Sequence, residues 1–80
     1  MAAATQAYVL IQTDVGRSGQ VAEEVGQIEG VIAAHNVTGN YDVIALAEAD
    51  SVDDLGRLVV NKIQLVHGIA RTTTCNVVHL

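Results

Sequence analysis

The feature that most constrains the fold is an order of segments that the chain runs through twice. Each half begins with an extended apolar segment, continues with a segment of helical spacing, reaches a glycine and ends in a second extended segment. Residues 28–31, Ile-Glu-Gly-Val, correspond to residues 66–69, Val-His-Gly-Ile. The implied order is strand, helix, strand, strand, helix, strand. A chain of 80 residues leaves room for one domain, residues 1–80.

The first half predicts a strand at residues 8–13, where apolar and β-branched residues follow one another. A helix is expected next, with Ser18 as its N-cap and Gly30 as the left-handed residue that ends it. Residues 31–38 are the second expected strand. The apolar stripe of the helix falls at helical spacing and consists of Val21, Ala22, Val25 and Ile28.

In the second half, the turn pair Gly39-Asn40 leads to a third expected strand at residues 43–48, which predicts a hairpin. Ser51, with Asp54 three residues later, indicates the start of a second helix. Its apolar stripe is Leu55, Leu58, Val59 and Ile63, and Gly56 is expected to allow close packing on the sheet. Residues 69–80 are the last expected strand, in which Cys75 should pack as a small hydrophobic residue.

This order of elements is the ferredoxin-like βαββαβ arrangement of the α+β class. Right-handed crossovers place both helices on one face of a four-stranded antiparallel sheet, and the other face stays open. Small domains usually need disulfides, a metal or oligomerisation, and Cys75 is the only cysteine. We therefore expect the open face to pair with a second copy.

Charge and composition exclude several classes of function. The formal net charge is −5, and the basic residues are scattered as Arg17, Arg57, Lys62 and Arg71, so binding of nucleic acid or of anionic membranes is not expected. Apolar runs fall far short of the roughly 20 residues of a membrane span. Residues 1–5 lack the basic start of a signal peptide. Together with the lone thiol, this indicates a cytoplasmic protein.

The segment Gly39-Asn40-Tyr41-Asp42 is the most informative motif, and with it the sequence resembles the amino-acid-binding effector (RAM) domain of the leucine-responsive Lrp/AsnC regulators. The resemblance runs from Ala7 to Val78. It rests also on Glu29-Gly30-Val31, on Asp54-Leu55, on the threonine run 72–74, and on His67-Gly68-Ile69, where the family often has Pro-Gly-Val.

The resemblance implies a site for a zwitterionic amino acid. Asp42 would accept hydrogen bonds from the ammonium group, and backbone N–H groups around Gly39 and Asn40 would donate to the carboxylate. The ring of Tyr41 would form a wall, and the hydroxyls of Thr72 and Thr74 would add contacts. The alternative for the hairpin is structural, with Gly39-Asn40 as a plain turn and Asp42 accepting from the amides of that turn.

The resemblance also implies an assembly, because family pockets are built between dimers. A homo-oligomer is expected, either a dimer or a ring of four dimers. Family members carry an N-terminal helix-turn-helix, whereas few residues precede the first strand here. The expectation is a stand-alone effector domain without direct DNA contacts. It would either sense an amino acid directly or co-assemble with a full-length regulator.

Two rival functions differ in class from this sensor. One is an assembly module without a ligand, and the other is an enzyme similar to the dimeric α/β-barrel monooxygenases. An enzyme of that kind would need a pocket lined by aromatic residues. Tyr8 and Tyr41 are the only aromatic residues, which are too few to line such a pocket. No cofactor and no metal are expected, since His35, His67 and His79 lack the spacing of a metal site. The sequence therefore favours a non-catalytic binding module.

Overall fold

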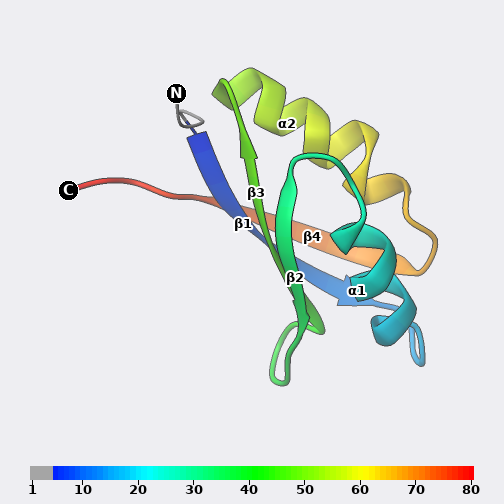
Figure 1. Ribbon diagram of the computed structural model, residues 1–80. Helices are drawn as coiled ribbons and strands as arrows, with labels where there is room; N and C mark the ends of the chain where they lie inside the picture. Colours follow the sequence, from blue (N-terminus) through cyan, green and yellow to red (C-terminus); the bar gives the residue numbers. More distant parts are fainter. Residues whose placement is uncertain (1–4) are drawn as a thin grey trace.

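The computed structural model describes residues 5–80 (Figure 1). The residues before Thr5, on which the expectation about a signal peptide depends, lie outside the described part. Within residues 5–80, no helix is long and apolar enough to cross a membrane. The elements in chain order are β1 (Thr5–Thr13), α1 (Ser18–Gly26), β2 (Val31–Asn36), β3 (Val43–Ala49), α2 (Val52–Asn61), the short 3-10 helix η1 (Ile63–Leu65) and β4 (Ile69–Asn76).

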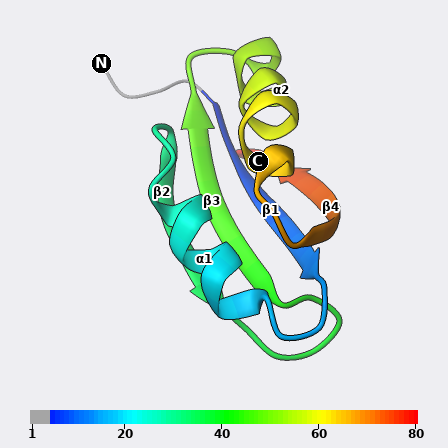
Figure 2. The same ribbon diagram turned by 90° about the vertical axis from the view of Figure 1, so that its right-hand side faces the viewer.

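The four strands form one antiparallel sheet in the order β2-β3-β1-β4. Both helices cover the same face of this sheet, as Figure 2 shows. Each helix connects two strands that run parallel and are separated by one other strand, which is the split βαβ unit. The α+β, ferredoxin-like arrangement expected from the sequence is confirmed.

The core fills the layer between the sheet and the two helices. Side chains alternate between the two faces of a strand, so every second residue of β1 and β3 points toward the helices. Six of these residues are fully buried: Ala7, Val9, Ile11, Val43, Ala45 and Ala47. The helices cover them with Val21, Val25, Leu55 and Val59, as the helical spacing predicted.

The two helices begin in different ways. The side chain of Ser51 accepts a hydrogen bond from the N–H of Asp54 at 3.1 Å, so the predicted cap of α2 is confirmed. The predicted cap of α1 was wrong, because Ser18 is already the first helical residue. The N-cap of α1 is Arg17, which makes no side-chain cap bond.

Two glycines differ from their predicted roles. Helix α1 ends at Gly26, and Gly30 instead adopts a φ of 98° in the turn that enters β2. A Cβ atom at Gly30 would lie 2.9 Å from Leu58 Cδ2, the flexible end of that side chain, so the positive φ rather than the packing is what favours glycine there. Gly56 does not pack on the sheet, since no atom would lie within 4 Å of its Cβ. It lies on the outer side of α2, because Leu55 and Val59 take the inward positions.

Both sheet-edge strands are shorter than predicted. β2 ends at Asn36, which pairs with Val43, the first residue of β3, so the partner strand stops there. β4 ends at Asn76 rather than at residue 80. Cys75 is exposed rather than packed, because it pairs with Tyr8 on the face of the sheet that the helices leave open.

That open face carries the apolar residues that alternate with the core. Tyr8 pairs with Leu46 and Leu10 pairs with Ile44, so four large side chains lie together on the central strands. Tyr8 is 46% exposed. His35 of β2 flanks this patch, because it pairs with Ile44 of β3. An apolar patch of this kind indicates a contact with another molecule.

Candidate ligand site

The loop that joins β2 to β3 lies against the end of β1 and is held there by hydrogen bonds. The backbone N–H of Asp42 donates to the carbonyl of Ile11 at 2.9 Å, and the Gln12 side chain donates to the carbonyl of Asn40 at 2.9 Å. Gly39 has a φ of 114°, as the turn chemistry predicted, whereas Asn40 does not adopt a positive φ. The loop therefore has a defined position on the sheet.

The Asp42 carboxylate accepts two hydrogen bonds from one residue of β1. Its Oδ2 atom accepts from the backbone N–H of Thr13 at 2.8 Å and from the Thr13 hydroxyl at 3.3 Å. Asp42 thus fixes the loop through a neighbouring strand rather than through the amides of its own turn. Within residues 5–80, its second oxygen, Oδ1, accepts no hydrogen bond from another side chain or from the backbone.

The other residues of the motif differ in exposure. Gly39 and Asn40 are exposed, and Tyr41 is half-buried beside Asp42. The structure thus brings Gly39, Asn40, Tyr41 and Asp42 together at one end of the sheet.

Thr72 and Thr74 lie on β4 and face the helices, because they pair with Ile11 and Val9. They line a cleft of about 300 Å³ between β4 and α2. The Thr72 hydroxyl accepts a hydrogen bond from the Gln64 side chain at 2.8 Å. The remaining walls of this cleft are mostly apolar and come from Val52, Leu55, Gly56, Val59, Val60 and Asn76.

One chain does not bring the two halves of the predicted site together. β1 lies between β3, which carries the hairpin, and β4, which carries the threonines. The cleft beside Thr72 and Thr74 has no wall from residues 39–42. A pocket that includes both groups would need a second chain.

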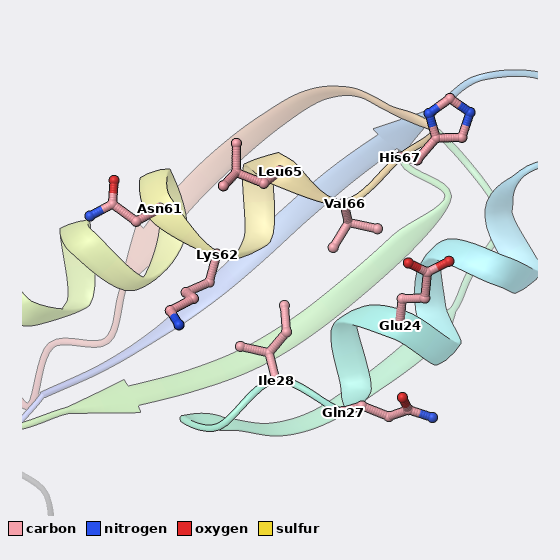
Figure 3. A pocket seen from close by; sticks show the side chains of 8 residues that line it. All are labelled: Glu24, Gln27, Ile28, Asn61, Lys62, Leu65, Val66 and His67. Carbon is pink, nitrogen blue, oxygen red and sulfur yellow. The ribbon is translucent and has the colours of Figure 1, made fainter.

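A larger groove of about 580 Å³ lies between the ends of the two helices. Figure 3 shows Ile28, in the turn after α1, and Val66 pointing toward one another across it, with Lys62 near one end and Glu24 below His67 at the other. Lys62 and His67 are exposed, and Glu24 accepts a hydrogen bond from Gln20 at 2.9 Å. Charges so open to water attract a ligand only weakly, so this groove is a poor candidate site.

Sequence reasoning missed three polar residues that shape these sites. Gln12 and Thr13 position the hairpin, and Gln64 positions the hydroxyl of Thr72. Their signal is faint, because a polar residue at the end of a strand is ordinary. Gln12 and Thr13 acquire their role only through the register between strands that are about 30 residues apart in the chain, whereas Gln64 of η1 contacts Thr72, eight residues further along.

The histidines occupy three separate environments. His35 is on the open face, His67 lines the groove between the helices, and His79 follows the end of β4. In the part of the chain that the structure describes, no three His, Cys, Asp or Glu side chains are grouped as metal ligands.

Comparison with known proteins tests the resemblance. The family described as the Lrp/AsnC ligand binding domain matches residues 6–79. The chain belongs to the Lrp/AsnC family. An uncharacterised HTH-type transcriptional regulator of Pyrococcus abyssi is 34% identical over 74 residues, which are 88% of this chain and 49% of the regulator. This Lrp/AsnC domain therefore spans about half the length of the curated relatives that it matches.

Solved structures share the fold of this Lrp/AsnC domain. A Thermus thermophilus protein has a TM-score of 0.88 at 29% identity, with 95% of each chain covered. A transcriptional regulator from Neisseria meningitidis, solved as a complex with L-Met, has a TM-score of 0.83 at 17% identity. That comparison covers 95% of this chain and 51% of the regulator, and at this identity it shows the fold alone.

Proposed function

We propose that this Lrp/AsnC domain is a non-catalytic, cytoplasmic effector module that binds an amino acid and assembles as a homo-oligomer. The observation that carries the proposal is the match of residues 6–79 to a ligand-binding family. Its curated relatives are HTH-type transcriptional regulators, which supports a role in regulation rather than in catalysis. The domain would sense the ligand directly or tune a full-length regulator by co-assembly.

The proposed ligand is a zwitterion held by the hairpin. Asp42 has an oxygen, Oδ1, available for the ammonium group, while Oδ2 keeps its bonds to Thr13. Exposed backbone around Gly39 and Asn40 suits the carboxylate, and Tyr41 provides an apolar wall. The Neisseria meningitidis regulator solved with L-Met supports an amino acid as the ligand class.

A second chain would complete the pocket. In one chain the hairpin and the pair Thr72 and Thr74 are separated by β1, and the hairpin itself is open to water. A desolvated zwitterion needs partners on all sides, because an unpaired buried charge is costly. Contacts between subunits would close the site, so ligand binding and assembly are expected to reinforce each other.

Thermal unfolding with each of the twenty amino acids tests the proposal. A ligand at 100 times its Kd should add about 2.7 kcal/mol to the free energy of unfolding. For a domain this small, the midpoint of unfolding should rise by roughly ten degrees. Asp42→Asn should abolish the shift, because it removes the charge that pairs with the ammonium.

Asp53→Asn is the matched control, since it makes the same chemical change on the exposed first turn of α2. It should leave the ligand-induced shift intact. If no amino acid shifts the midpoint of an oligomeric sample, the sensor proposal is wrong. The openness of the hairpin in one chain would then favour the alternative, an assembly module without a ligand.

A further inference from the structure

Among residues 5–80, no charged side chain lines the cleft between β4 and α2. Its wall on α2 is apolar and consists of Val52, Leu55, Gly56, Val59 and Val60. Its wall on β4 and η1 is polar but uncharged and consists of Gln64, Thr72, Thr74 and Asn76. The volume of about 300 Å³ suits a small molecule, since ligand pockets are mostly apolar with a few placed polar groups. The two walls can therefore hold different parts of one ligand.

The polar wall suits the charged end of a bound amino acid. The Thr72 hydroxyl accepts a hydrogen bond from the Gln64 side chain at 2.8 Å, which ties β4 to η1. A hydroxyl that accepts in this way still has its own hydrogen to donate. Thr74, two residues further along the same face of β4, adds a second hydroxyl. With the hairpin of a second chain holding the zwitterion beside these threonines, the ligand's side chain would lie on the apolar wall.

Gly56 is the residue of the apolar wall that the fold itself does not explain. It lies in the middle of α2, where glycine lowers the stability of a helix relative to alanine. Its φ is not positive, and a Cβ there would meet no atom within 4 Å. Neither the backbone conformation nor close packing therefore calls for glycine at this position.

The missing side chain of Gly56 leaves a gap in the apolar wall. Val52 and Val60 are each four residues away, so they flank Gly56 on the same face of the helix. They are 60% and 55% exposed. An aliphatic group placed in the gap would remove part of both valine side chains from water, which is favourable.

We propose that Gly56 determines ligand specificity, and that the cleft takes the uncharged aliphatic side chain of an amino acid such as leucine or methionine. The inference rests on the proposed function and adds the class of side chain to it. An aliphatic side chain is stabilised by contact with Val52 and Val60. A charged side chain would lose water in the cleft without gaining a charged partner.

The charged residues on the outer side of α2 do not supply that partner. Asp53 and Arg57 line a groove on the other side of Gly56. Arg57 already donates to Asp54 at 2.8 Å, and the side chains of this pair are 65% and 52% exposed. Charges so open to water attract a ligand only weakly. The apolar wall therefore decides which side chain binds.

Isothermal titration with L-leucine, L-methionine, L-alanine, L-lysine and L-glutamate tests the class of side chain. Leucine or methionine should bind at least about tenfold more tightly than the other three. Alanine lacks the methylene groups that fill the gap, and lysine and glutamate bring an unpaired charge. Tightest binding of lysine or glutamate, lost in Asp42→Asn, would overturn this inference and leave the amino-acid sensor intact. If none of the twenty amino acids binds, the proposed function is wrong and the inference with it.

Gly56→Leu tests the gap itself. The new side chain would lie between Val52 and Val60 and should weaken leucine binding by about tenfold or more. The ligand-free variant should unfold at a higher temperature, because leucine favours a helix more than glycine does. Gly19→Leu is the matched control, since Gly19 is an exposed glycine of α1 and its Cβ would also meet no atom within 4 Å. Unchanged leucine affinity in Gly56→Leu, or an equal loss in Gly19→Leu, would overturn the role of Gly56.

Val60→Glu tests whether the apolar wall selects against charge. A carboxylate on this wall would pair with the ammonium group of a lysine side chain, so lysine affinity should rise about tenfold or more while leucine affinity falls. Asn61→Glu is the control, because it adds the same charge one residue further on, outside the cleft. An unchanged order of affinities in Val60→Glu would show that the ligand's side chain lies elsewhere.

Discussion

Asp42 combines a structural contact with the proposed contact to a ligand, and two substitutions separate them. Asp42→Ala removes the acceptor for the Thr13 N–H and hydroxyl and should lower the free energy of unfolding by about 1–2 kcal/mol. Asp42→Asn keeps an amide oxygen for Thr13 and should cost less than half as much. Chemical denaturation without ligand measures both. Equal losses would contradict the importance of the Thr13 bonds.

At the residue scale, the sequence identified the motif but not its partners. Gly39, Tyr41 and Asp42 were recognisable because their order resembles a family pattern. The contacts from Gln12 and Thr13 depend on the register of β1 against β3, which no local pattern encodes. For the same reason, the separation of Thr72 and Thr74 from the hairpin became visible only in the sheet.

At the scale of elements, periodicity predicted the type and order of every strand and of both long helices. The ends were less predictable, because a strand ends where its partner ends rather than where β-branched residues stop. β2 shows this at Asn36, opposite the first residue of β3. The burial of Ala7, Val9 and Ile11, in contrast, follows directly from alternation.

The connection between η1 and β4 provides a prediction at this scale. Gly68 has a φ of 101°, and a Cβ there would lie 3.0 Å from Arg17 Cβ and 3.2 Å from Val21 Cγ2. Gly68→Ala should therefore add a packing clash to the backbone strain and cost about 2–4 kcal/mol in unfolding free energy. Gly16→Ala has a similar φ of 81° in open space and should cost only about 1–2 kcal/mol. Denaturant titration measures the free energy of unfolding of both variants. Equal losses would show that the structure around residue 68 relaxes and removes the clash.

At the scale of the whole molecule, a single chain has a small core and leaves apolar surface in water. The core has no aromatic residue, and Cys75 allows no disulfide within the chain. Tyr8, Leu10, Ile44 and Leu46 form an apolar patch on the central strands of the open face. Association through this face would remove that patch from water, at roughly 25 cal/mol for each Å² of apolar surface buried.

If two copies associate through their open sheet faces, a charge introduced into the apolar patch should reduce the mass of the assembly. Leu46→Glu places a carboxylate in the middle of the patch, opposite Tyr8, where pairing would bury it without a partner. The sedimenting mass should fall, while far-UV circular dichroism of the chain stays the same because Leu46 lies outside the core. Asn61→Glu adds the same charge at the exposed end of α2, on the opposite side of the sheet, and should leave the mass unchanged. If Leu46→Glu assembles like the parent, the open face is not a subunit contact. The amino-acid site would then have to be completed by another surface.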